Sequence, residues 1–132
     1  MTVISETDQH LARLDDGILR CAIRRVPERS AADGADLFKT LAAKLKAQVT
    51  TADAFILDLR EAPQVAGPQT AEVVGSLFQT FARYKRRVAV VTAQDPVQQL
   101  QMRRLITENA PRLGALFTDD AAAEAFVIAP DR

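Results

Sequence analysis

The spacing of apolar and polar residues changes along this chain, and each spacing predicts a different element. At 18–26 the sequence ILRCAIRRV alternates apolar and polar side chains, which is the two-residue period of a strand with one face in water. Asp16-Gly17 precedes it, and an Asp-Gly pair between two extended stretches favours a tight hairpin turn. The segment 10–14 is therefore the predicted partner strand, and the chain is predicted to open with an antiparallel ribbon.

A break rich in proline, glycine and charge follows at 25–36, and the period then becomes helical. Apolar residues at helical spacing predict an amphipathic helix from about 35 to 49. The next segment, AFILDL at 54–59, is a nearly continuous apolar run, typical of a strand that helices cover on both faces. Asp58 interrupts this run. We expect it to end the strand and to organise the turn before the next helix.

The second half of the chain alternates strands with helices that open on capping or first-turn residues. The helix openings are Gly67-Pro68, Asp95-Pro96 and the segment 118–120. The strands between them are VAVVTA at 88–93 and the short ALFTDD at 115–120. This order predicts one α/β domain over residues 1–132, with a mostly parallel or mixed sheet, an N-terminal antiparallel ribbon and about four helices.

The amino-acid composition indicates which classes of partner and which cellular location to expect for this protein. The 132 residues are 48% hydrophobic and 26% charged, as in an ordinary globular domain. Basic and acidic residues balance at 17 each and aromatics make up only 5%, so we expect no nucleic-acid partner. The N-terminus lacks a signal-peptide pattern and no apolar run approaches the ~20 residues of a membrane helix, so we expect no membrane association. Cys21 is the only cysteine, which favours a cytoplasmic location.

An aspartate at the end of one strand and VVTA at the end of the next resemble the receiver domains of response regulators. In that family a phosphoacceptor aspartate ends one strand and a threonine or serine ends the next. Receivers hold magnesium with an acidic pair at a strand-to-helix junction, but Asp15 and Asp16 lie in a predicted hairpin turn. Asp119 also stands near the position where a receiver carries a lysine. A degenerate receiver is therefore the least favoured function.

A second resemblance covers 57–127, which includes LDLREAPQVAGPQTAEVV, FARYKRRVAVVT and MRRLITENAPRLGALFTDDAAAEAF. This segment resembles the STAS-like domains of bacterial anti-sigma factor antagonists and the related STAS/SEC14-type single-domain proteins. Their pattern is an apolar-Asp-Leu strand, a loop and helix, an apolar strand, a helix, a short strand with phenylalanine and a terminal helix. An opening antiparallel ribbon also belongs to that pattern. The resemblance implies a STAS-like fold and a regulatory, non-catalytic role.

Antagonists of that family carry a phosphorylatable serine at the start of the helix after the aspartate strand. The sequence here is Ala66-Gly67-Pro68-Gln69-Thr70, in which Thr70 offers the only nearby hydroxyl. A phosphate on Thr70 would meet free backbone N–H groups and the positive end of the helix dipole. A local hydrogen-bonding role for this first-turn threonine is nonetheless favoured. We therefore expect the interaction role of the family without its phosphorylation switch.

These observations favour a regulatory or scaffolding module that is not an enzyme and uses no metal and no cofactor. We expect it to bind another protein, such as a regulator or a kinase-like partner, through the Asp58 strand end and the helix start at 67–75. The alternative is a carrier or sensor of a small apolar or anionic ligand. An unsealed edge of the ribbon also favours a homodimer by strand addition. The predicted binding residues are Asp58, Arg60, Gly67, Gln69 and Thr70.

Overall fold

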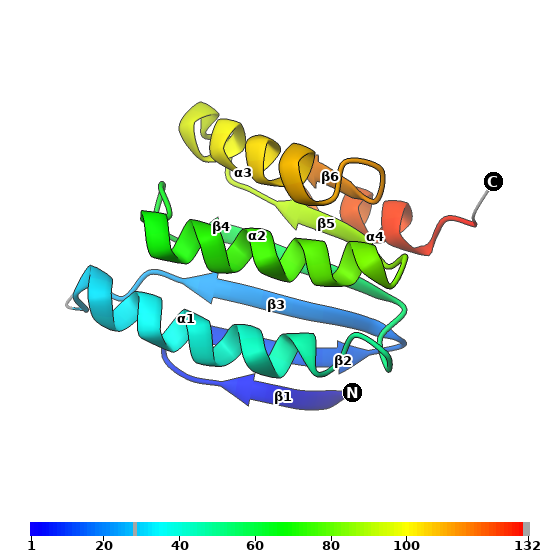
Figure 1. Ribbon diagram of the computed structural model, residues 1–132, viewed down its shortest axis with the longest axis horizontal. Helices are drawn as coiled ribbons and strands as arrows, with labels where there is room; N and C mark the ends of the chain where they lie inside the picture. The colour runs from blue at the N-terminus through cyan, green and yellow to red at the C-terminus, as the bar shows by residue number, and fades with distance from the viewer. Residues whose placement is uncertain (28, 131–132) are drawn as a thin grey trace.

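A computed structural model describes residues 1–27 and 29–130 as one six-stranded sheet with four helices packed on it (Figure 1). The strands follow one another across the sheet in chain order, β1-β2-β3-β4-β5-β6. The elements are β1 (Thr2–Glu6), β2 (His10–Asp15), β3 (Ile18–Arg24), α1 (Ala31–Lys46), β4 (Ala54–Glu61), α2 (Pro68–Arg83), β5 (Arg87–Val91), α3 (Pro96–Asn109), β6 (Gly114–Phe117) and α4 (Asp120–Ile128).

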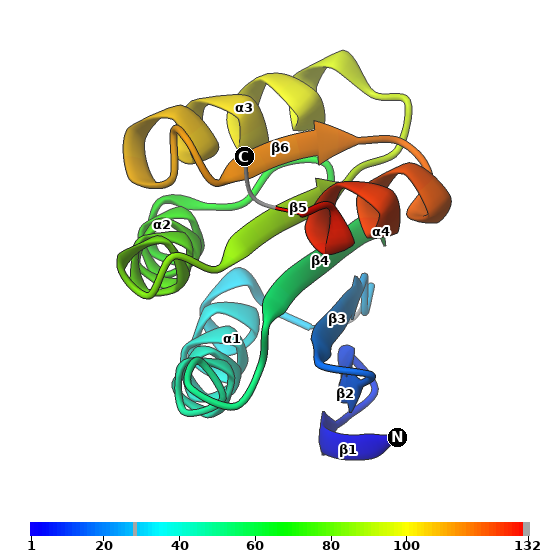
Figure 2. The same ribbon diagram turned by 90° about the vertical axis from the view of Figure 1, so that its right-hand side faces the viewer.

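The sheet is mixed, as predicted. β1, β2 and β3 pair antiparallel, whereas β3, β4, β5 and β6 pair parallel. Parallel neighbours need a crossover connection, and α1, α2 and α3 provide three of these on one face of the sheet (Figures 1 and 2). α4 returns to the other face (Figure 2). The predicted α/β class, N-terminal antiparallel ribbon and helix number are therefore confirmed.

The predicted hairpin lies between β2 and β3, whose register runs from His10 opposite Ile23 to Asp15 opposite Ile18. Its two central residues, Asp16 and Gly17, have φ angles of 50° and 80°. Two consecutive positive φ values match a type I′ turn, whose twist fits the twist of the flanking strands. The Asp-Gly pair therefore fixes the register of the ribbon.

The ribbon has a third strand that the sequence pattern did not predict. β1 pairs with β2, and its register shifts between Val3 and Ser5. The irregularity leaves both Ile4 and Ser5 directed at the core, although they are consecutive. Because the bulge breaks the two-residue period, this strand does not show the alternation by which strands are recognised.

The first helix begins four residues earlier than expected. Ser30 is its N-cap, and the Ser30 side chain accepts a hydrogen bond of 3.1 Å from the backbone N–H of Asp33. A serine cap of this kind favours a helix start by about 0.5–2 kcal/mol over alanine, enough to offset the glycine at position 34. The boundary prediction at 35 was therefore wrong, although the helical assignment was right.

The core forms on both faces of the sheet. The larger cluster lies between the sheet and α1, α2 and α3, and includes Phe55 stacked on Phe81 with ring centroids 4.9 Å apart. The smaller cluster lies between the sheet and α4 and includes Ile56. Phe55 and Ile56 are consecutive in β4, so successive side chains of this strand enter different clusters. This alternation decides where Asp58 points.

Candidate functional site

Asp58 lies inside β4, three residues before its end, and so does not end the strand as expected. Leu57 and Leu59 belong to the core on the α1–α3 side. Asp58 alternates with them and faces the α4 side, where it contributes to a shallow hollow of about 200 Å³. The carboxylate therefore points away from the turn that it was expected to organise.

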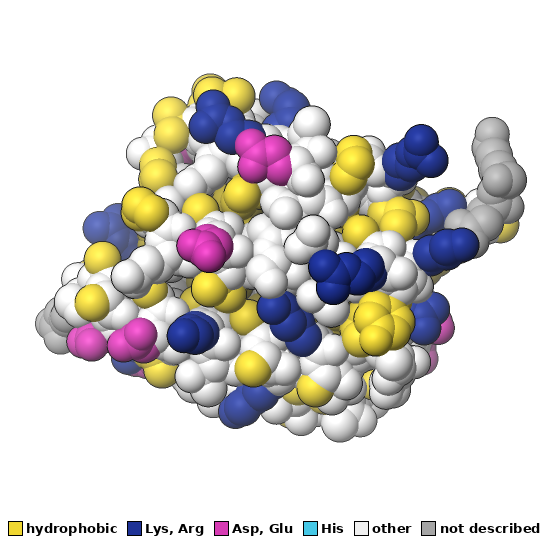
Figure 3. Space-filling view, in the orientation of Figure 1, with side chains coloured by type: hydrophobic (Ala, Val, Ile, Leu, Met, Phe, Trp, Pro, Cys, Tyr) yellow, Lys and Arg dark blue, Asp and Glu magenta, His cyan; other side chains and the backbone are white. Residues whose placement is uncertain are grey.

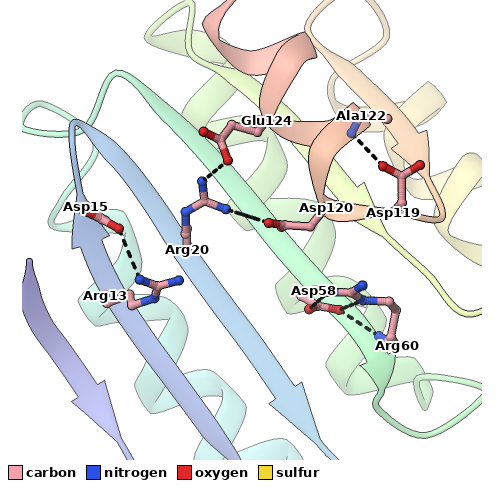
Figure 4. Close-up of polar contacts among 9 residues, drawn as sticks. All are labelled: Arg13, Asp15, Arg20, Asp58, Arg60, Asp119, Asp120, Ala122 and Glu124. Carbon is pink, nitrogen blue, oxygen red and sulfur yellow. Dashed lines mark hydrogen bonds and ion pairs between the residues drawn. The ribbon is translucent and has the colours of Figure 1, made fainter.

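Arg60 lies two residues further along the same strand and binds the carboxylate of Asp58 (Figure 4). Asp58 Oδ1 accepts hydrogen bonds from the backbone N–H of Arg60 at 3.0 Å and from its Nε at 3.1 Å. Asp58 Oδ2 accepts from Arg60 Nη2 at 2.8 Å. Partial burial raises the pKa of Asp58, but the bonds from Arg60 outweigh it and the net pKa is below the usual value. Asp58 is therefore an ionised carboxylate whose charge is balanced by Arg60.

The neighbouring arginines are paired in the same way (Figure 4). Arg20 on β3 reaches across to α4, with its guanidinium 3.3 Å from Asp120 and 2.8 Å from Glu124. Arg13 on β2 pairs with Asp15 at 3.2 Å. Arg13, Arg20 and Arg60 thus each have a carboxylate partner, and the contacts of Arg20 to Asp120 and Glu124 help to hold α4 against the sheet.

The geometry gives no support to a receiver-type phosphoacceptor at Asp58. Val91 is the Cα partner of Asp58 across the sheet, so Thr92 is directed to the opposite face, where it is fully buried. In the described part of the chain no lysine pairs with Asp58, and no group of three or more His, Cys, Asp and Glu residues could hold a metal ion.

Gly67, Gln69 and Thr70 lie on the other side of the sheet and line a cavity of about 680 Å³. The five predicted binding residues are therefore divided between two faces, two in the shallow hollow and three in this cavity. The cavity lies at the carboxyl end of the parallel strands, where α1, α2 and α3 all begin (Figure 1). Open α/β sheets commonly place their ligands at this end.

The deep part of the cavity is apolar. Its wall is formed by side chains that also belong to the main core, so the cavity extends between the helices and the sheet. These residues are Ile23 on β3, Phe38 on α1, Leu59 on β4, Val74 on α2 and Met102 on α3. A wall of this composition favours binding of an apolar ligand, because each CH₂ group of the ligand that is buried against it contributes about 0.8 kcal/mol to the binding free energy.

Two glutamines of α3 shape the rim of the cavity, and sequence analysis did not identify them. Gln98 is only 3% exposed; its Nε2 donates to the Leu59 carbonyl at 2.9 Å and its Oε1 accepts from the Ala93 N–H at 2.9 Å. Gln101 binds both the N–H and the carbonyl of Ala66, each at 2.8 Å. The available signal was the presence of uncharged amides in the first turns of a helix whose buried face should be apolar.

The start of α2 differs from the starts of the other helices. Its N-cap is Gly67, which supplies no side-chain hydrogen bond, and its first turn holds no acidic residue. Ser30, Asp95 and Asp119 cap α1, α3 and α4 through their side-chain oxygens. The positive end of the α2 dipole is therefore not offset by a residue of its own first turn.

The single cysteine and the single histidine do not form a catalytic pair. Burial, together with the charge of Asp58, raises the pKa of the Cys21 thiol to about 12, which leaves it protonated and unreactive at neutral pH. His10 lies opposite Ile23, two residues along β3 from Cys21. Its ring nitrogens contact Ser5 Oγ at 2.8 Å and Thr7 Oγ1 at 3.2 Å. Both residues are part of the ribbon's packing.

Arg86 and Arg87, which follow α2, bind backbone carbonyls. Arg86 Nε donates to the Val49 carbonyl at 3.1 Å, and Arg87 Nη1 donates to the carbonyls of Phe126 and Ala129, both at 2.8 Å. The bonds of Arg87 fix the end of α4 against the start of β5. Both arginines thus have structural roles that tie the chain after α2 to other segments.

Over the described residues, every helix is too short or too polar to cross a lipid bilayer. Comparison of the chain with protein-family models, with curated proteins and with solved structures finds no match.

Proposed function

We propose that this domain is a non-catalytic binding module that holds a small ligand with an apolar body in the cavity at the start of α2. The observation that carries this proposal is the cavity itself, about 680 Å³ in volume and apolar in its depth. Ligand sites are typically clefts of about 300–1,000 Å³ with mostly apolar walls and a few polar groups. Gln69, Thr70, Gln98 and Gln101 are polar residues of this lining.

The chemistry of the lining supports a role in binding. Within the described residues, the lining holds no His, Cys, Asp or Glu side chain, and its side-chain hydroxyls come from Ser30 and Thr70. Nucleophilic catalysis requires a hydroxyl or thiol next to a general base. Among the described lining residues, none is such a base next to the Ser30 or Thr70 hydroxyl.

The STAS-like assignment and the cytoplasmic location remain part of the proposal. The mixed sheet, the antiparallel ribbon at its start and the four helices are compatible with a STAS-like regulatory domain of bacterial type. The cytoplasmic location is supported by the unpaired, buried Cys21.

Native mass spectrometry of freshly purified protein tests the ligand proposal. The wild-type chain should carry a bound small molecule after purification or after incubation with apolar compounds. Ala35→Phe places a ring in the cavity wall and should abolish the bound mass. Ala43→Phe makes the same change at an exposed position of the same helix and should leave it unchanged. A wild-type chain that never carries a bound mass, or equal retention by both variants, would contradict the proposal.

A second candidate function is the docking of a partner protein at the start of α2. Val65, Val97 and Leu100 are exposed by 52%, 49% and 58%, and hydrophobic side chains gather where α2 and α3 begin (Figure 3). The pair of bonds between Gln101 and Ala66 brings the 65–66 loop against α3. Because Asp58 faces the α4 side, this surface includes the 67–75 segment without Asp58.

Partner recovery in a pull-down tests the docking candidate. Gln69→Arg adds charge and bulk to the exposed start of α2 and should reduce recovery. Gln79→Arg makes the same change at an exposed position near the other end of that helix and serves as the control. Equal recovery with both variants would exclude this surface.

Self-association is proposed at the free edge of β1, which is one of the two edge strands of the described sheet and belongs to the N-terminal ribbon. An edge strand offers unpaired backbone groups to a second copy. Light scattering at increasing protein concentration should show a mass of two chains, and a mass of one chain throughout would contradict this assignment.

A further inference from the structure

Among the residues that the structure describes, the charged side chains that line the cavity are all basic. Arg24, Arg25 and Arg29 contribute to the wall, and no aspartate or glutamate does so among the residues that the structure describes. The chain as a whole is balanced at 17 basic and 17 acidic residues, so this local excess is not a consequence of composition. An excess of one charge in a hollow with low-dielectric walls attracts ligands of the opposite charge.

The three arginines do not contribute equally. Arg29 binds Asp8 through two bonds of 3.0 Å, and this contact fixes the loop between β3 and α1 to the ribbon. Arg24 and Arg25 are exposed, and within the described residues neither has an acidic partner within 4.0 Å. The mouth of the cavity therefore carries two positive charges that no described carboxylate offsets.

The start of α2 lies at the same mouth and adds to this charge. Gly67 and Gln69 line the cavity, and the helix that they open has neither a capping side chain nor an acidic first turn. A helix N-terminus in this state stabilises an anion through its free N–H groups and its dipole. This feature strengthens the charge argument, which rests first on the arginines.

We infer that the ligand is an anionic amphiphile, with an apolar body between Phe38, Leu59 and Val74 and one carboxylate or phosphate group at Arg24 and Arg25. This inference rests on the proposed function and names the ligand class of that same cavity. A neutral apolar ligand would leave Arg24 and Arg25 without a counter-charge from any described residue. A free inorganic anion would leave the apolar depth unfilled. An amphiphile matches both parts of the cavity at once.

Calorimetric titration with four compounds tests the ligand class. Decanoate and decyl phosphate share a chain and differ in the anionic group, decanol has the same chain without charge, and inorganic phosphate has the charge without a chain. We expect at least one of the two anionic amphiphiles to bind about tenfold or more tightly than decanol, and inorganic phosphate to show no binding. Whichever of decanoate and decyl phosphate binds more tightly shows whether the preferred anionic group is a carboxylate or a phosphate.

Two sets of variants locate the anionic group. Arg24→Gln with Arg25→Gln removes two positive charges at exposed positions. It should weaken binding of the anionic compound about tenfold or more and leave binding of decanol unchanged. Gly67→Asp and Gly67→Asn should both add an N-cap, because an added Cβ meets no atom within 4 Å and the backbone is extended there. The pair differs only in charge, so the aspartate variant should bind the anionic compound about tenfold more weakly than the asparagine variant.

The outcomes separate this inference from the function on which it rests. If decanol binds as tightly as the anionic compounds, or if the arginine variants bind the anionic compounds as tightly as the wild type does, the inference of an anionic group is wrong. The proposed function, binding of an apolar ligand, would then still stand. Equal binding by the two Gly67 variants would also overturn the placement of that group. Failure of decanoate, decyl phosphate and decanol alike would overturn both the inference and the proposed function.

Discussion

Gln101 holds Ala66 at both of its backbone polar groups, accepting from the N–H and donating to the carbonyl, each at 2.8 Å. This pair of bonds fixes the loop that leads into α2 against α3. The position of the cavity rim, and therefore of Gly67 and Thr70, depends on it. A single side chain thus connects two segments that are 35 residues apart in the sequence.

Replacing Gln101 with alanine should loosen the rim. Each of the two bonds contributes about 0.5–1.5 kcal/mol, so Gln101→Ala should lower the free energy of unfolding by about 1–3 kcal/mol and weaken ligand retention. Hydrogen exchange at the Ala66 amide should accelerate. Gln94→Ala, at an exposed position outside the cavity lining, serves as the control and should leave both quantities unchanged. A protected Ala66 amide in Gln101→Ala would contradict this role.

The ion pair between Asp58 and Arg60 should be separable from ligand binding, because it lies on the opposite face of the sheet. Arg60→Ala removes the side-chain bonds and the charge that lower the pKa of Asp58 but keeps the backbone N–H bond, so that pKa should rise, as NMR titration of the carboxyl carbon would show. The pair is partly exposed and screened, so the loss in stability should stay below about 1 kcal/mol. Weaker ligand binding in this variant would mean that the two faces are coupled.

Acid should destabilise the ribbon through His10. Burial, with the charge of Lys44, lowers the pKa of this imidazole below its usual value of 6.5, and Asp8 offsets part of the effect. The unfolded chain then binds more protons than the folded chain below about pH 6.5. Stability should therefore fall as the pH drops from 6.5 to the lowered pKa.

Denaturant unfolding between pH 7.5 and 5 measures this dependence. His10→Gln removes the titrating group and keeps a polar side chain next to Ser5 and Thr7, so its stability should vary less over this range. Parallel curves for the wild type and His10→Gln would show that His10 does not contribute.

Cys21 should resist thiol reagents in the folded protein. Its side chain is 1% exposed and its pKa is raised to about 12, so little thiolate is available at pH 8. Labelling should follow global unfolding and become fast in denaturant. Rapid labelling of the native protein would contradict the packing of the ribbon.

The elements that local chemistry fixes were predictable from the sequence. Asp95 caps α3 in front of Pro96, and Asp16-Gly17 forms the hairpin, as their residue types require. β1 was missed because a bulge at Ile4 removes the alternation by which strands are recognised. The start of α1 was misplaced because Ser30 lies inside a segment that reads as a loop.

The site was less predictable, for two physical reasons. The run around Asp58 is apolar on both sides, so its pattern does not say where β4 ends or which cluster each residue enters. The cavity is assembled from the end of β3, the loop before α2 and the first turns of α3, which only the topology brings together. Gly67, Gln69 and Thr70 were identified because helix openings have a local signature, whereas Gln98 and Gln101 offered only the weaker signal of uncharged amides in the first turns of a helix.

Mapping of backbone amide shifts by NMR during titration with decanoate and decyl phosphate tests the central claim most directly. We predict that shifts concentrate at Gly67, Thr70 and Gln101, which surround the cavity, and leave Asp58 and Arg60 unchanged. Shifts centred on Asp58 and Arg60, or no shift around the cavity with either compound, would contradict it.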